Sequence, residues 1–175
     1  MKYLIVVDMQ NDFISGSLAN EAAQKIVKPL ADYIKEFQGT MIFTRDTHSE
    51  DYLETYEGKN LPVKHCIMDT DGWQINEELV DAVVGKEKYA YVFDKPTFGY
   101  ASRLANFIKQ FDQYPTSIEF TGTCTDICII SNVLGLKEFF PEIDIIVHSN
   151  LCAGLSEEKH NAALEVMKSC QVKVL

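Results

Sequence analysis

The chain has 175 residues, of which 46% are hydrophobic and 24% charged, as is ordinary for one globular domain with a buried core. Its 16 Lys and Arg against 26 Asp and Glu give a formal net charge of -10, and it has no dense basic run, so we expect no nucleic-acid partner. No apolar run approaches the roughly 18–20 residues that span a bilayer, and the N-terminus lacks the apolar stretch of a secretory signal, so we expect a cytoplasmic protein without membrane association.

The first half of the chain alternates apolar runs with amphipathic segments. YLIVV at 3–7 predicts a strand that is buried on both faces. Residues 20–37 carry apolar side chains at helical spacing, and TMIFT at 40–44 predicts a second strand. Residues 46–73 have no clear period and read as a long loop, which in compact domains is usually functional or disordered. A short helix is expected at about 75–83.

The second half continues this alternation. In chain order we expect a strand at 89–93, a helix at 99–111, a strand at 117–121, a helix from near Thr125 to Phe140, a strand at 143–147, a helix at 156–170 and a last strand at 171–175. Six strands that alternate with helices imply βαβ units and a mainly parallel sheet covered on both faces. We therefore expect one three-layer α/β/α domain over residues 1–175, with ligands bound beyond the carboxyl ends of the strands.

Three chemically active side chains follow three different strands. Asp8 comes directly after the first strand, Lys95 after the third, and Cys128 in the first helical turn after the fourth. Taken alone, Asp8 is as readily explained as a turn or helix-cap residue as by a catalytic role. A lysine such as Lys95 is usually a solvated surface group. Because the carboxyl ends of parallel strands converge, the three together make a base, a cation and a thiol, the parts of covalent acyl-transfer catalysis.

The segment GTCTDIC at 122–128 holds two candidate thiols, Cys124 and Cys128. Gly122 permits an unusual backbone turn, and a helix N-terminus and a nearby lysine both stabilise a thiolate. Unpaired N–H groups at such a turn also bind an oxyanion. An odd number of cysteines without a signal indicates reduced thiols. The other three, Cys66, Cys152 and Cys170, are expected as small core residues.

A second group of polar residues follows the second strand. Asp46 and His48 are two apart in an extended segment and point the same way. His65 lies farther along the loop, with Glu57 between. Two histidines and one or two carboxylates suit Zn²⁺, Fe²⁺ or Mn²⁺, although polar residues on a surface loop are the alternative. The remaining histidines have no expected partner: His148 is expected at a strand end and His160 on a helix surface.

Six motifs spread over nearly the whole chain resemble those of the isochorismatase-like cysteine hydrolases, and within them the nicotinamidase/pyrazinamidase group. They are VVDMQNDF at 6–13, TRDTH at 44–48, LPVKHC at 61–66, DKPTFGY at 94–100, GTCTDIC at 122–128 and the closing AALEVMKSCQVKVL. The resemblance implies a catalytic triad and one divalent metal ion (Zn, Fe or Mn). The triad would be Asp8, Lys95 and Cys128, and the metal ligands Asp46, His48 and His65, with Glu57 as a fourth.

The resemblance further implies a metal-dependent nicotinamidase that works on a small-molecule amide. The sequence leaves the oligomeric state open, with a homo-oligomer as one alternative. It implies a cis peptide bond between Thr123 and Cys124, which would aim the Cys124 and Cys128 N–H groups at the oxyanion. Phe13 would pack on the substrate ring. The group often carries a Trp just before the second metal histidine, where this chain has residues 61–64, and its only Trp is Trp73.

Two other readings remain open. One is an amidase of the same family that acts on a different small amide. The other is a catalytically silent α/β domain that only binds a ligand, against which the complete triad argues. The metal-ligand pattern argues against a vinyl-ether hydrolase of the isochorismatase type, which uses neither a metal nor a thiol.

Overall fold

The central strand of the molecule is β1 (Lys2–Val7), as the computed structural model of all 175 residues shows. The other strands are β2 (Thr40–Asp46), β3 (Ala90–Lys95), β4 (Ser117–Thr123), β5 (Asp144–Ala153) and β6 (Lys173–Val174). They form one sheet in the order β3-β2-β1-β4-β5-β6, and every neighbouring pair is parallel. The predicted six-stranded parallel sheet is therefore confirmed.

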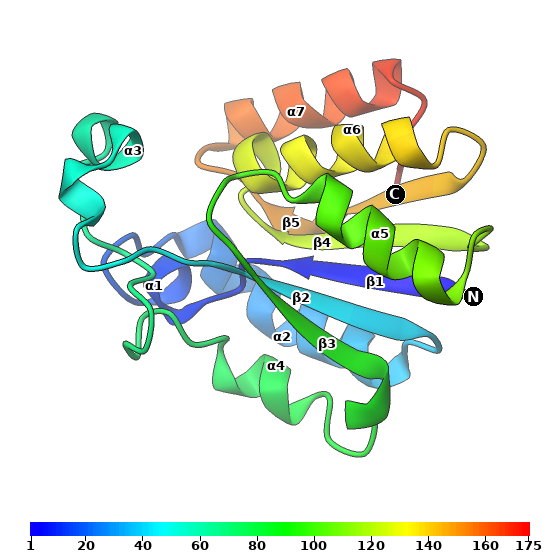
Figure 1. The fold of residues 1–175 in the computed structure, drawn as a ribbon, viewed down its shortest axis with the longest axis horizontal. Helices are drawn as coiled ribbons and strands as arrows, with labels where there is room; N and C mark the ends of the chain where they lie inside the picture. The colour runs from blue at the N-terminus through cyan, green and yellow to red at the C-terminus, as the bar shows by residue number, and fades with distance from the viewer.

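Helices cover both faces of this sheet, as Figure 1 shows. The helices are α1 (Asn11–Ile14), α2 (Glu21–Glu36), α3 (Tyr56–Asn60), α4 (Glu77–Asp81), α5 (Ala101–Phe111), α6 (Ile130–Phe139) and α7 (Glu157–Ser169). In Figure 1, α5, α6 and α7 lie above the sheet, whereas α2 and α4 lie below it. The three layers that the sequence predicts are therefore present. None of the helices combines the length and apolar character that crossing a bilayer requires.

The continuous apolar run of β1 feeds two separate cores, because successive side chains of a strand point to opposite faces. Tyr3, Ile5 and Val7 belong to the core under α5, α6 and α7. Leu4 and Val6 belong to the core under α2 and α4. All five are fully buried. A strand buried on both faces has no polar side to present, which explains the absence of alternation in its sequence.

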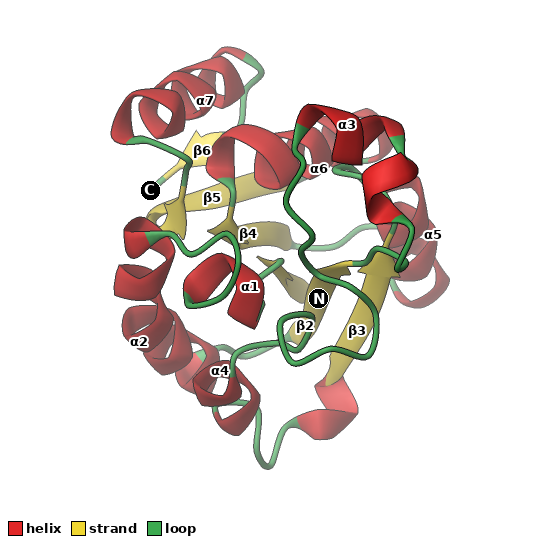
Figure 2. Ribbon diagram, turned by 90° about the vertical axis from the view of Figure 1, so that its left-hand side faces the viewer, coloured by secondary structure: helices red, strands yellow, loops and turns green.

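The strand order reverses at the boundary between β1 and β4. From β1 the chain moves outward to β2 and β3, then returns to β4 on the other side of β1. Such a reversal opens a crevice at the carboxyl ends of the strands. Gly122 allows β4 to lie close to β1 here. Its φ is +114°, and a Cβ at this position would lie 2.1 Å from the Val7 carbonyl oxygen. Figure 2 looks at the end of the sheet where α1 and α3 lie.

The predicted long loop at 46–73 is only partly irregular. It contains a 3-10 turn (η1, Tyr52–Glu54) and the short helix α3, which directly follows the capping residue Thr55. The Thr55 hydroxyl accepts a hydrogen bond from the Gly58 N–H at 3.0 Å. Both elements are too short to show an apolar period, so the sequence pattern misses them.

The predicted helix from Thr125 to Phe140 is also corrected. Residues 125–129 form a π-helical turn (η3), and the α-helix α6 begins at Ile130. The hydrogen-bonding pattern of a π turn differs from that of an α-helix by one residue. A sequence period of 3.6 cannot separate the two over five residues.

Candidate active site

Three side chains that follow different strands meet at the carboxyl edge of the sheet. The Lys95 Nζ lies 2.7 Å from the Asp8 Oδ2 and 3.5 Å from the Cys128 Sγ. The side chains of Lys95 and Asp8 are both 0% exposed. The structure thus brings together the base, the cation and the thiol that the sequence predicts, and the cation contacts both of the others.

The backbone holds Asp8 in an uncommon conformation. Its φ is +50°, in the left-handed region that aspartate tolerates better than most residues. The chain therefore turns sharply as it leaves β1. The Thr44 hydroxyl donates a hydrogen bond of 2.6 Å to the Asp8 Oδ1, which fixes the carboxylate on the side of β2. Thr44 was not singled out in the sequence, because its contact crosses from one strand to the next.

Lys95 favours the thiolate of Cys128, as the sequence predicts, but it is not the only influence on this thiol. Burial raises the pKa of Cys128 well above its ordinary value, and the nearby Asp8 raises it further, against the opposing effect of Lys95. Burial also raises the pKa of Asp8, although Lys95 opposes this. These surroundings make the thiol a weaker acid and the carboxylate a stronger base than the same groups in water.

Lys95 stays charged despite its burial. Burial alone would lower its pKa, but Asp8, Cys128 and Asp46 outweigh it and hold the pKa above its ordinary value. The Lys95 Nζ also lies 3.2 Å from the Asp46 Oδ1. The buried Lys95 cation therefore contacts both Asp8 of the candidate triad and Asp46 beside it.

The turn that carries Cys128 begins at a cis peptide bond between Thr123 and Cys124, as the family resemblance implied. The Cys124 carbonyl oxygen accepts hydrogen bonds from the N–H groups of Ile127 and Ile129, each 3.1 Å long. On the far side of the turn, the Thr125 hydroxyl and the His160 Nδ1 lie 2.8 Å apart. The role of the Cys124 and Cys128 N–H groups at an oxyanion stays a prediction.

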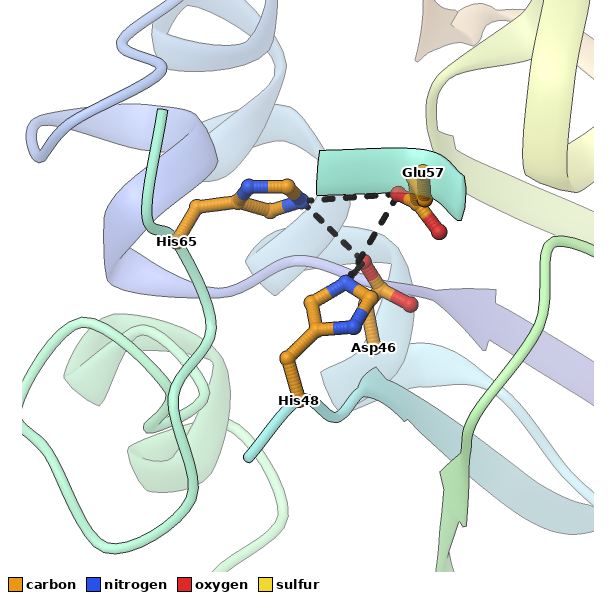
Figure 3. Close-up of side chains that lie close together, drawn as sticks. All are labelled: Asp46, His48, Glu57 and His65. Carbon is orange, nitrogen blue, oxygen red and sulfur yellow. Dashed lines mark hydrogen bonds and ion pairs between the residues drawn. The ribbon is translucent and has the colours of Figure 1, made fainter. Parts of the chain in front are cut away.

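The four predicted metal ligands form one cluster, shown in Figure 3. One ligand atom from each residue, Asp46, His48, Glu57 and His65, lies within 4.8 Å of all the others. The Asp46 Oδ2 is 3.0 Å from the His48 Nε2 and 3.5 Å from the His65 Nε2. The Glu57 Oε1 is 3.7 Å and 3.9 Å from the same two nitrogens. Glu57, which the sequence did not place geometrically, therefore completes the group.

Neighbouring residues fix the orientation of this cluster. The His65 Nδ1 lies 2.8 Å from the Val63 carbonyl oxygen, which leaves the Nε2 facing the other ligands. The ring of Tyr52, itself fully buried, lies 4.6 Å from the ring of His48 and 4.9 Å from that of His65. Tyr52 was not predicted from the sequence, where its signal was an aromatic residue inside a polar loop.

Gln10 is a second residue that the sequence analysis missed. It is 0% exposed, and its Oε1 accepts a 2.7 Å hydrogen bond from the Asp46 N–H. Its Nε2 donates to the carbonyl oxygens of Asp46 and Trp73, each at 2.9 Å. Gln10 thus ties the segment after β1 to the end of β2. Its position inside the DMQNDF motif was the available signal.

A pocket of about 400 Å³ opens above these groups, and residues of the triad and of the metal cluster both line it. Its lining includes Cys128, Asp46, Glu57, His65, Phe13 and Phe98. Phe13 therefore lines the pocket, and its packing on a substrate ring stays a prediction. Trp73 is absent from the lining, because its Nε1 donates to Thr47 and the Arg45 guanidinium stacks on its ring.

Three expectations for other residues are corrected. Cys170 is exposed, whereas Cys66 and Cys152 are buried as predicted. His148 lies inside β5 and has partners: its Nε2 is 2.8 Å from the buried Glu119 and 3.2 Å from the Tyr33 hydroxyl. His160 is not a plain surface residue, because it contacts Thr125 and burial lowers its pKa. These contacts join elements far apart in the sequence.

Residues 2–175 match the Isochorismatase domain family. A nicotinamidase/pyrazinamidase from Mycobacterium tuberculosis is 26% identical over 187 residues, which cover 100% of this chain and 98% of that protein. The crystal structure of a pyrazinamidase/nicotinamidase from Streptococcus mutans superposes with a TM-score of 0.88 at 26% identity, with 100% of both chains covered. A pyrazinamidase of Pyrococcus horikoshii, solved in complex with zinc, gives a TM-score of 0.81 at 24% identity and covers 99% of this chain and 98% of its own.

Proposed function

This chain belongs to the isochorismatase domain family, and we propose that it is an amidohydrolase that converts nicotinamide and water to nicotinate and ammonia. The observation that carries the proposal is a single pocket lined both by Cys128 and by the cluster of Asp46, Glu57 and His65. A nucleophile at one part of a pocket and a candidate metal at another suit a substrate with two separate polar groups. Nicotinamide has such a pair in its carboxamide and its ring nitrogen.

We propose that the first half of the reaction forms a thioester on Cys128. Asp8 removes the thiol proton as the Sγ attacks the carboxamide carbon. The negative charge moves to the carboxamide oxygen, which the Cys124 and Cys128 N–H groups stabilise. Asp8 then returns the proton to the amide nitrogen, the carbon–nitrogen bond breaks and ammonia leaves.

The second half hydrolyses the thioester. Asp8 takes a proton from water, the resulting hydroxide attacks the same carbon, and the carbon–sulfur bond breaks. The Cys128 thiolate then takes its proton back from Asp8, and the product is nicotinic acid, which loses its proton to solvent and leaves as nicotinate. Lys95 keeps its charge throughout. It orients the Asp8 carboxylate and stabilises negative charge on the Cys128 sulfur whenever it develops.

Asp46, His48, Glu57 and His65 fit a divalent ion by the chemistry of their donor set. Two imidazole nitrogens and two carboxylates are ligands that Zn²⁺, Fe²⁺ and Mn²⁺ all accept. Burial raises the pKa of Glu57, and the negative charge of Asp46 raises it further, so an added cation would relieve the repulsion between the two carboxylates. When bound, the ion supplies a Lewis acid for the pyridine nitrogen of the substrate.

The five free cysteines suit a reducing compartment, so we place the protein in the cytoplasm. The partner of the site is a small molecule. Residues 1–175 would form one domain that carries the whole site.

The test is ammonia release from a panel of amides: nicotinamide, pyrazinamide, benzamide and acetamide, each with the protein purified without chelator. We expect turnover with nicotinamide and pyrazinamide, because both carry a ring nitrogen and a carboxamide. Turnover confined to benzamide or acetamide would instead identify an amidase for a different substrate. Binding of nicotinamide without ammonia release would indicate a catalytically silent binding domain.

A further inference from the structure

A buried amide that the proposed mechanism does not use joins two walls of the pocket. Asn132 lies in α6, one helical turn after Cys128, and is 0% exposed. Its Nδ2 donates to the Cys128 carbonyl oxygen at 2.7 Å and to the Phe98 carbonyl oxygen at 3.1 Å. Its Oδ1 accepts from the Tyr100 N–H at 2.6 Å. One side chain therefore links the nucleophile's backbone to the segment between β3 and α5.

That segment has little else to hold it. Within residues 96–99, the Thr97 hydroxyl bonds to Gly99 of the same segment, and the one hydrogen bond to another element is that from Asn132 to Phe98. Phe98 lines the pocket, and 45% of its surface is exposed. Asn132 therefore supplies the side-chain hydrogen bonds that tie this aromatic wall to α6.

Only an amide of this length satisfies all three partners. Its carbonyl oxygen meets the Tyr100 N–H, and its NH₂ group supplies two donors for two carbonyl oxygens. Aspartate lacks the donors, and leucine lacks both kinds of group. A serine can still donate to the carbonyl four residues earlier in its own helix, but it cannot reach the segment at 96–100.

We propose that Asn132 is a positioning residue for substrate specificity: it holds Phe98 against the bound ring, so that the site selects amides carried on a planar aromatic ring. This rests on the proposed amidase function. Because Asn132 holds this wall in place before the substrate binds, no binding energy is spent on ordering it. Loss of the Asn132 link should therefore weaken substrate binding. The link involves the carbonyl oxygen of Cys128 and not its sulfur, so the contact between the sulfur and Lys95 should keep its geometry.

The variant Asn132→Ser tests the proposal, because it keeps the bond within α6 and removes the two bonds to the segment. We expect KM for nicotinamide to rise about tenfold, because a wall that is no longer held in place has to be ordered at the expense of binding energy, while kcat changes little. Alkylation of Cys128 by iodoacetamide, a reagent without a ring, should keep its parent rate when followed by peptide mapping. Ser131→Ala is the matched control, because its exposed hydroxyl bonds only to the Ile127 carbonyl oxygen, and it should behave as the parent.

A double-mutant cycle with Phe98→Ala shows whether Asn132 acts through Phe98. Phe98→Ala alone should raise KM for nicotinamide, and adding Asn132→Ser should then change KM little. If Asn132 had a merely structural role, the effects of the two substitutions on KM would add, and Asn132→Ser would lower kcat by as much as it raises KM. Either result would overturn the proposal. So would an unchanged KM in Asn132→Ser.

A measurement that needs no catalysis separates this proposal from the proposed function. Hydrogen exchange at the Tyr100 N–H should become faster in Asn132→Ser and stay unchanged in Ser131→Ala. Unchanged exchange in Asn132→Ser would overturn the link itself. If the two variants show this difference in exchange but the parent protein releases no ammonia from nicotinamide, the link stands and the proposed function is overturned, and the ring specificity with it.

Discussion

At the scale of single residues, the site is a chain of buried charges. Asp8, Lys95 and Asp46 lie in contact, and the two carboxylates share one lysine. Removing one member of a buried ion pair leaves the other without compensation, which typically costs about 3–5 kcal/mol. Each of these side chains therefore affects stability as well as chemistry, and tests of catalysis need variants that separate the two.

Cys128→Ala should abolish amide hydrolysis and leave the fold intact, because alanine fills most of the space of a small buried thiol but cannot form a thioester. The measurement is ammonia release together with the circular dichroism spectrum. Cys124→Ala is the matched control: that residue contributes its N–H group, which alanine keeps, so the loss should be much smaller. A Cys128→Ala protein with near-parent turnover would exclude the covalent mechanism.

Asp8→Asn should lower kcat by about 10²–10⁴-fold, the range that a general acid–base group contributes. The amide cannot accept the thiol proton, and the buried thiol has a raised pKa that makes the base necessary. Steady-state kinetics with nicotinamide measures the loss. Parent-like kinetics would reduce Asp8 to a turn residue.

Lys95→Ala should slow the alkylation of Cys128 by iodoacetamide at neutral pH. The lysine lowers the pKa of Cys128 against burial and Asp8, so its removal raises that pKa and reduces the thiolate fraction. The rate is followed by mass spectrometry of the Cys128 peptide, with the exposed Cys170 as the internal reference. An unchanged ratio of the two rates would show that Lys95 does not stabilise the Cys128 thiolate.

At the scale of elements, the short helix α3 decides whether Glu57 reaches the metal cluster. α3 packs against the turn η1 so closely that a Cβ at Gly58 would lie 2.0 Å from the Tyr52 carbonyl oxygen. Tyr52 in turn packs on the rings of His48 and His65. A glycine and an aromatic residue therefore order a segment that has no apolar period.

Gly58→Ala should weaken metal binding by about 10–100-fold, as the loss of a supporting contact around a metal site typically does. The new Cβ pushes α3 away from η1 and moves the adjacent Glu57 out of place. Competition of Zn²⁺ between the protein and a coloured chelator measures the affinity. Lys59→Ala, an exposed change in the same helix, should bind the metal like the parent. Equal affinities in the two variants would exclude Glu57 as a ligand.

At the scale of the whole molecule, the strand order sets which residues meet. The reversal between β1 and β4 places Asp8 and the Cys128 turn on either side of one crevice. Lys95 ends β3 and Asp46 ends β2, and these two residues are partners in the register of the sheet. The triad and the metal cluster are therefore parts of one edge, joined by Lys95.

Metal binding should stabilise the whole domain, since its ligands come from the end of β2, the segment just after it, α3 and the loop that follows α3. A ligand present at 100 times its Kd adds about 2.7 kcal/mol to the free energy of unfolding. For a chain of this size that corresponds to a rise in Tm of about 5–10 °C. Thermal unfolding with Zn²⁺ and with a chelator measures the shift. The double variant His48→Ala, His65→Ala should show no shift, and a shift of equal size there would place the metal elsewhere.

The sequence by itself determined the alternation of strands and helices, and with it the parallel sheet and the edge at which Asp8, Lys95 and Cys128 had to lie. Apolar runs and helical spacing report which backbone conformation buries a segment, and this information is local. The family motifs added the roles of these residues.

Only the tertiary structure decided how the residues meet and what their surroundings do to them. The raised pKa of Cys128, the sharing of Lys95 between Asp8 and Asp46, and the link from Asn132 to Phe98 all join segments that are far apart in the sequence. Burial and charge proximity depend on strand order and side-chain packing, which leave no periodic trace in the sequence. The catalytic groups could therefore be predicted one by one, whereas their protonation states and supporting contacts required the folded chain.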